Sequence, residues 1–284
     1  MIEALLSAGP LQTVALGTLM LGALAGALGC FAVLRRESLM GDVLSHAALP
    51  GICLGYMAAG GRSLPWILGG ALIAGLLAAA SVQAVKRLTK IKPDAAMGVV
   101  LSSFFALGTV LLSLISHHGG TGQAGLSSFL FGQAAAMLRS DLILIACTFA
   151  LVVLILILAW KDLKLATFDR EYARAIGRPI TAIEGLLAAI TAAAIVLGLQ
   201  VVGVVLMVAL LIAPAVAARQ WVEGLLPMIL LAALIGAGCG FAGAMISSGA
   251  RGLATGPIIV LLASAAALLS LLLSPKRGLL KRLK

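Results

Sequence analysis

Long runs of apolar residues, separated by short polar segments, extend along this chain from residue 11 to residue 273. A helix needs about 20 such residues to cross the hydrocarbon core of a bilayer. The pattern therefore predicts an all-α polytopic membrane protein with about nine transmembrane helices. The predicted spans are residues 11–34, 42–59, 65–85, 94–116, 141–160, 180–199, 201–217, 225–247 and 255–273.

The boundary between the seventh span and the one before it, at Gln200–Gly203, is the least distinct, because two apolar runs meet there almost without polar residues. Eight spans, or a broken or re-entrant element near residues 120–139, would also fit the pattern. The first ten residues lack the basic start and the cleavage pattern of a signal peptide, so we expect the first span to be retained. We interpret residues 1–284 as a single transmembrane domain.

The composition agrees with this class, since 62% of the 284 residues are hydrophobic and only 11% are charged. The net charge of +10 indicates topology rather than nucleic-acid binding, because the basic residues gather in alternate loops. With the N-terminus outside, nearly all of the 20 Lys and Arg residues lie in cytoplasmic segments. There they can contact the anionic lipid of the cytoplasmic face. The exceptions are Arg62, Arg139 and Arg251, and the C-terminus is then cytoplasmic.

Asp42 and His46 lie four residues apart within the otherwise apolar stretch from Ser38 to Tyr56. An aspartate at the centre of a membrane helix costs roughly 2.5–3.5 kcal/mol, so such a group is a candidate for function. Residues at this spacing share one helix face, where a carboxylate and an imidazole can reach one divalent cation. The alternative is an Asp–His hydrogen bond that only holds two helices together. Pro50 predicts a kink or unwinding just beyond the pair.

The one long polar segment on the predicted cytoplasmic side is residues 161–179. Either Thr167 or Asp169 has the character of a helix start, and Gly177 is typical of a helix end. We therefore expect a short amphipathic helix at about 167–178 that lies on lipid or docks a soluble partner. Because the segment carries both acidic and basic residues, a protein partner is favoured over lipid alone.

Small residues recur at four-residue spacing in two of the predicted spans. Stripes of this kind let membrane helices approach closely, which predicts a compact bundle. The two stripes are Gly22/Gly26 and Ala232/Gly236/Gly240/Ala244. The four cysteines fall within predicted spans without paired spacing, and we interpret them as buried, inert side chains.

Other polar residues rank below the Asp42–His46 pair as functional candidates. Glu184 lies near the predicted cytoplasmic start of its span, where it would cap the helix or extend to the interface. His117 and His118 stand at the outer end of the fourth span, beside a glycine-rich segment. They are candidates for receiving a metal at the outer mouth, although paired histidines there are more often a solvated loop end.

Three blocks of the sequence resemble the membrane subunits of the manganese/zinc/iron family of bacterial ABC importers. The third block contains Glu171, Ala173 and Gly177 in the E-x-A-x-x-x-G order of the coupling motif, with Tyr172 where that motif generally has alanine. The order and spacing of the blocks fit over essentially the whole chain. The blocks are RRESLMGDVLSHAALPGICLGY (35–56), ATFDREYARAIG (166–177) and VGVVLMVALLIAPAVAA (202–218).

The resemblance implies a permease subunit of an ATP-driven importer for Mn²⁺, Zn²⁺ or Fe²⁺, with Mn²⁺ favoured, in the bacterial cytoplasmic membrane. Two permease subunits, identical or different, would form the pathway. Cytosolic ATP-binding subunits and an extracytoplasmic metal-binding protein would be its partners. Asp42 and His46 match positions that line the cation path, and Glu171, Ala173 and Gly177 match positions that couple to the ATPase. No permanently bound cofactor is expected, only the transported metal.

The sequence itself contains no G-x-x-x-x-G-K-[ST] phosphate loop, so we do not expect it to be an enzyme. If transport is driven by ATP, another polypeptide must hydrolyse it. Two alternatives stay open. One is a gradient-driven metal/proton antiporter with Asp42 and His46 as the proton-coupled site. The other is a permease for a metal chelate or cobalamin, which would need a wide apolar cavity.

Overall fold

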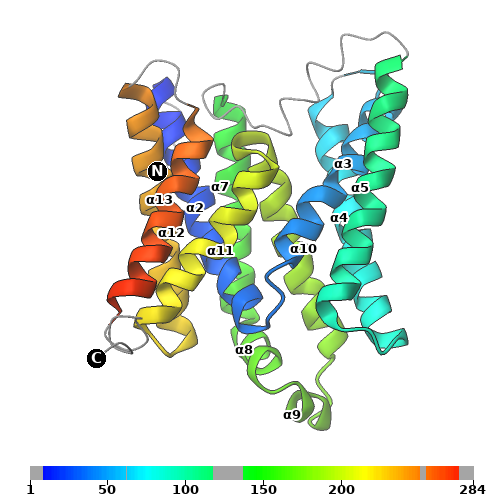
Figure 1. Cartoon of the computed structure of the whole chain (residues 1–284), viewed down its shortest axis with the longest axis vertical. Helices are drawn as coiled ribbons and strands as arrows, with labels where there is room; N and C mark the ends of the chain where they lie inside the picture. The colour runs from blue at the N-terminus through cyan, green and yellow to red at the C-terminus, as the bar shows by residue number, and fades with distance from the viewer. Residues whose placement is uncertain (1–8, 62, 118–136, 250–253, 275–284) are drawn as a thin grey trace.

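The computed structural model describes residues 9–61, 63–117, 137–249 and 254–274, and the regular elements within them are helices. Each predicted span falls mainly on one long helix, although residues 201 and 202 of the seventh span belong to α10 and residue 160 of the fifth to α8 (Figure 1). Two further short helices, α8 and α9, lie between α7 and α10. The bounds are α2 Pro10–Leu34, α3 Met40–Ala58, α4 Leu64–Leu88, α5 Pro93–His117, α7 Arg139–Leu158, α8 Trp160–Phe168, α9 Arg170–Ala175, α10 Ile180–Val202, α11 Val204–Trp221, α12 Leu225–Gly249 and α13 Thr255–Leu273.

Among the described residues, 7 helices are long and apolar enough to cross a membrane. This confirms a polytopic membrane protein. The two long helices outside that set are α3 and α11. Helix α3 carries Asp42, His46 and Pro50, which interrupt its otherwise apolar sequence.

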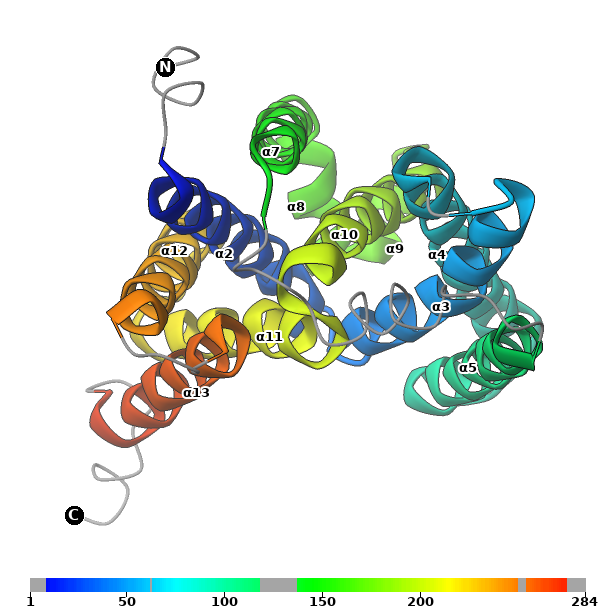
Figure 2. The same ribbon diagram turned by 90° about the horizontal axis from the view of Figure 1, so that it is seen from above.

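The helices form two groups with a pair of helices between them. Seen from above, α3, α4 and α5 lie on one side, α2, α12 and α13 lie on the other, and α10 and α11 stand between (Figure 2). Helix α2 begins at one end of the bundle, and α13 finishes at the opposite end (Figure 1). Helices α8 and α9 project from this second end, which we call the α9 end.

The two stripes of small residues pack against each other, which the sequence did not indicate. A Cβ atom added to Gly22 would overlap the backbone carbonyl of Gly236, and one added to Gly26 would overlap that of Ala232. The hydroxyl of Thr18 donates a hydrogen bond across this contact to the carbonyl oxygen of Gly240, at 3.0 Å. The backbones of α2 and α12 therefore touch, as small residues in membrane helices allow.

The junction between α10 and α11 is a single residue. Gly203 has φ 85° and ψ 168°, a conformation that L-residues with side chains rarely adopt, and it separates Val202 from Val204. The indistinct boundary at Gln200–Gly203 is therefore a real break between two helices with almost no connecting loop.

Pro50 does not unwind α3, which was one of the two outcomes expected beyond the Asp42–His46 pair; the other, a kink, stays a prediction. The helix continues through Pro50 to Ala58. A Cβ atom added to Gly108 of α5 would lie 2.9 Å from Cδ of Pro50, so the proline ring packs against a position that has no side chain. Packing by a neighbouring helix is one way in which membrane helices tolerate an internal proline.

Candidate functional site

Helix α3 presents Asp42 and His46 on one face, as their spacing predicts. Nε2 of His46 lies 3.4 Å from Oδ1 of Asp42, and the two side chains are 28% and 36% exposed, respectively. The edge of the His46 ring meets the ring of Phe105 from α5, with centroids 4.9 Å apart and planes at 81°. The pair is therefore partly sheltered by α5 but remains open on its other side.

The geometry of the pair suits a shared metal ion. If a cation makes bonds of about 2.1 Å to each of two atoms 3.4 Å apart, the angle between the bonds is about 108°, near the tetrahedral value. Divalent metals take at least four ligands, however, and the described residues contain no cluster of three His, Cys, Asp or Glu side chains that could hold one. The described part of one chain therefore supplies at most part of a coordination sphere from these side-chain types.

His117 does not form a cluster with this pair. His117 is the last residue of α5, at the end of the bundle opposite α9. His118 and the adjoining glycine-rich segment lie outside the described residues, as does most of the region near 120–139. A role of His117 or His118 in receiving metal stays a prediction.

The polar segment at the α9 end folds as two short helices rather than one. Asp169 separates them, and its side chain accepts a hydrogen bond from the backbone N–H of Tyr172 at 2.9 Å, which caps α9. Thr167 is not a helix start, because it lies inside α8 and its hydroxyl donates to the carbonyl oxygen of Leu163. Helix α9 is therefore shorter than the expected element at 167–178.

Gly177 closes α9 in the left-handed conformation, with φ 76°. The N–H of Arg178 donates to the carbonyl of Ala173 at 3.0 Å, and the N–H of Gly177 donates to that of Arg174 at 3.0 Å. These bonds satisfy carbonyl groups that a helix end otherwise leaves unpaired.

The residues of the E-x-A-x-x-x-G pattern face in different directions on this small element. Ala173 is fully buried, whereas Glu171 and Gly177 are exposed. Large apolar side chains also point outward here, since Tyr172 is 56% exposed and Ile176 49%. Helix α9 is thus a knob that is anchored through Ala173 and presents an apolar, partly charged surface at the tip of the molecule (Figure 1).

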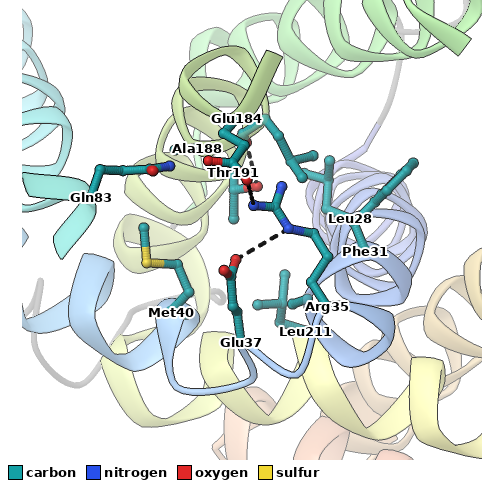
Figure 3. Close-up of a pocket in the computed structure, with 13 residues that line it drawn as sticks. Leu28, Phe31, Arg35, Glu37, Met40, Gln83, Glu184, Ala188, Thr191 and Leu211 are labelled. Atoms are coloured by element: carbon teal, nitrogen blue, oxygen red, sulfur yellow. Dashed lines mark hydrogen bonds and ion pairs between the residues drawn. The ribbon is translucent and has the colours of Figure 1, made fainter. Parts of the chain in front are cut away.

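A buried network of ion pairs lies at the α9 end, and it was not predicted from the sequence. Arg35, in the turn after α2, reaches Glu184 of α10 at 3.0 Å and Glu37 at 3.3 Å (Figure 3). The side chains of Arg35 and Glu184 are only 4% and 8% exposed. Glu184 therefore neither caps its helix nor extends to the interface, because it pairs with a buried arginine.

Two more cations complete the network. Lys86 of α4 forms an ion pair with Glu37, and Arg170 of α9 reaches both Glu37, at 3.4 Å, and Glu184, at 3.2 Å. Burial on its own would raise the pKa of Glu37, but Arg35, Lys86 and Arg170 outweigh it and hold that pKa below its ordinary value. Burial lowers the pKa of the Arg35 guanidinium, while both carboxylates act in the opposite direction.

Comparison with known proteins gives one consistent result along the chain. A model of the ABC 3 transport family matches residues 8–274. The manganese transport system membrane protein MntC of Bacillus subtilis (strain 168) is 47% identical over 94% of this chain, which spans 62% of that relative's length. The zinc transport system membrane protein TroC of Treponema pallidum (strain Nichols) is 45% identical over 96% of this chain and 92% of its own.

A solved structure has the same fold. PsaBC from Streptococcus pneumoniae in complex with Fab superposes with a TM-score of 0.83 and 34% sequence identity, covering 100% of this chain and 98% of the matched chain. The superposed region therefore spans α2 to α13, including the segments that hold Asp42, His46 and α9 in this chain.

Proposed function

Because the chain belongs to the ABC 3 transport family, we propose that it is the membrane permease subunit of an ATP-driven importer for a divalent transition metal. Mn²⁺ is the favoured cargo, with Zn²⁺ and Fe²⁺ as the other candidates, since relatives at 47% and 45% identity are named for manganese and zinc transport. The protein would cross the bacterial cytoplasmic membrane nine times, with its N-terminus outside and the α9 end in the cytoplasm. The basic loops support this orientation.

The Asp42–His46 pair is the observation that favours a bare metal ion as the cargo. Nε2 of His46 and Oδ1 of Asp42 lie 3.4 Å apart on a helix of the membrane bundle. A carboxylate and an imidazole form an oxygen and nitrogen donor set without sulfur, which suits Mn²⁺, Fe²⁺ and Zn²⁺. A chelated metal would hide its charge within its own ligands and would not need these donors. The pair therefore favours a cation without a carrier molecule.

A second permease subunit, identical or different, would complete the coordination sphere. The pair is open on one side, and α5 beside it exposes much of its apolar surface. We propose that a second subunit faces this side, so that two Asp–His pairs converge on one ion. The large exposed side chains of α5 are Val99, Phe105, Leu107, Val110 and Leu114.

Helix α9 is the proposed contact with the cytosolic ATP-binding subunit. Helix α9 stands at the tip of the molecule, beyond the long apolar helices (Figure 1). Tyr172 in this helix and Ile176 directly after it are exposed, so a soluble partner can cover them. In this knob, Glu171 would supply a negative charge and Ala173 would anchor the helix. Gly177 would end it. An extracytoplasmic metal-binding protein would deliver the ion at the opposite end of the bundle.

Substitution of the two proposed ligands tests the function. Asp42→Asn and His46→Gln keep the size of each side chain but remove the carboxylate charge or the imidazole donor. We expect each variant to insert normally and to reduce radioactive Mn²⁺ uptake to background in cells that supply the partner subunits. Asp94→Asn is the matched control, because Asp94 is an exposed carboxylate at the start of α5. Wild-type uptake by either ligand variant, at equal protein level, would refute the site.

A further inference from the structure

The ion-pair network joins the proposed coupling helix to the start of the metal-bearing helix. Glu37 lies in the turn between α2 and α3, where its N–H donates to Ala32 and its carbonyl accepts from the N–H of Met40, both at 2.9 Å. Met40 is the first residue of α3, and Asp42 follows two residues later. The turn also holds Arg36 at φ 58°, which a residue with a side chain rarely adopts. The backbone of Glu37 is thus fixed to the first turn of α3.

Arg170 is the member of the network that comes from the α8–α9 segment. Arg35, Glu37, Lys86 and Glu184 belong to the membrane bundle and its α2–α3 turn. Arg170 is the first residue of α9, and its Nη2 atom contacts one carboxylate oxygen of Glu37 and one of Glu184. A single guanidinium therefore connects α9 both to the turn before α3 and to α10.

The charges of the network show that Arg170 is not needed to neutralise it. Arg35 and Lys86 already balance the two carboxylates, so Arg170 adds a third positive charge to a largely buried cluster. The positive charge of Arg170 repels that of Arg35 and therefore lowers the pKa of Arg35. A third cation at this place stabilises the fold less than its contacts suggest, because repulsion between cations offsets part of the attraction. Its placement points to a role besides stability.

We propose that Arg170 is a positioning residue for transport, which links the movement of α9 to the α2–α3 turn and thereby to the Asp42–His46 pair. When the ATP-binding subunit displaces α9, Arg170 pulls on the carboxylates of Glu37 and Glu184 through its ion pairs with them. Because Glu37 is bonded through its backbone to Met40, the displacement reaches the helix that carries both proposed ligands. This inference rests on the proposed function, since it needs an ATPase that moves α9.

The test measures how much metal is transported for each ATP hydrolysed. The permease, its ATP-binding subunit and the delivery protein are reconstituted in liposomes, and Mn²⁺ uptake and phosphate release are followed together. We expect Arg170→Ala to assemble with the ATPase and to hydrolyse ATP, while Mn²⁺ transported per ATP falls at least about fivefold, the lower range of coupling between sites. Arg170→Lys, which keeps the positive charge but replaces the guanidinium with an ammonium group, should restore part of the coupling.

The control variant is Lys164→Ala, which removes an exposed positive charge from α8 and should keep the wild-type ratio. The double variant Arg170→Ala/Glu37→Gln shows whether the two residues affect coupling through each other or independently. If Arg170 acts through Glu37, the double variant should lose no more coupling than the more impaired single variant. The proposal would be overturned if the double variant lost coupling by the product of the two single losses. It would also be overturned if Arg170→Ala kept the wild-type ratio of Mn²⁺ to ATP, or if both Arg170 variants lost ATPase binding. Failure of the wild-type complex to transport any of Mn²⁺, Zn²⁺ and Fe²⁺ would instead refute the proposed function.

Discussion

Gly22 of α2 and Gly236 of α12 lie in direct backbone contact, such that a Cβ atom on either residue would overlap the carbonyl oxygen of the other. The contact continues one turn away in each direction, at Gly26 with Ala232 and at Thr18 with Gly240. The group that contains α2 and α12 is therefore held together by close backbone packing. Large side chains would force these two helices apart.

We predict that Gly22→Leu destabilises the protein by about 1–3 kcal/mol, the usual cost of overpacking a close contact. Gly238→Ala is the control, because Gly238 lies on the same helix as Gly236 and a Cβ atom there would have no neighbour within 4 Å. Thermal unfolding of the two variants in detergent measures the difference. Equal melting temperatures for Gly22→Leu and wild type would contradict the packing of α2 on α12.

Gly177 should matter for coupling because of its backbone rather than its contacts. At φ 76° a residue with a side chain costs roughly 1–2 kcal/mol, while a Cβ atom there would meet nothing within 4 Å. We expect Gly177→Val to distort the end of α9 and to weaken co-purification of the ATP-binding subunit, leaving the membrane bundle folded. Gly185→Ala is the control, since Gly185 has helical backbone and also has open space around it. Normal ATPase binding by Gly177→Val would argue against α9 as the docking element.

The ion-pair network predicts a pH dependence of stability. The pKa of Glu37 lies below its ordinary value of 4.5 in the folded protein, so the carboxylate contributes stability that is complete above about pH 4.5. This contribution is lost as the pH falls through the folded-state pKa. The melting temperature of Glu37→Gln should therefore lie below that of wild type at pH 7, and the gap should close in more acidic buffer. A gap that does not narrow as the pH falls would show that Glu37 does not act through its charge.

The sequence was sufficient to predict the membrane class, the helical segments and the Asp42–His46 juxtaposition. These features depend on local properties, namely the length of apolar runs and the spacing of residues on one helix face. The cap at Asp169 and the helix end at Gly177 were also predictable, because side-chain capping and a left-handed glycine act within one turn.

The network around Glu37 was not predicted, because its members come from four segments that only the fold brings together. The charges of Arg35, Lys86 and Arg170 were interpreted as topology signals, and Glu184 was interpreted as an interfacial residue. One signal was available. A carboxylate that stands one turn inside an apolar helix needs a cation nearby, and such a requirement points to a partner even when it does not identify one.

The behaviour of α3 at Pro50 and the pairing of the two small-residue stripes were hidden for the same reason. A proline predicts a break only when no neighbour compensates, and here α5 supplies Gly108 at the point of contact. The glycine stripes indicated that close helix contacts exist, but four-residue spacing carries no information on which helix is the partner.

The most direct test of the account is the energy source of metal transport. The purified chain reconstituted alone in liposomes, with an imposed pH or sodium gradient, should move no Mn²⁺ or Zn²⁺. Addition of the ATP-binding subunit, the delivery protein and ATP should produce inward flux that Asp42→Asn abolishes. Gradient-driven metal flux through the isolated chain would contradict the importer and establish an antiporter that uses the same Asp42–His46 pair.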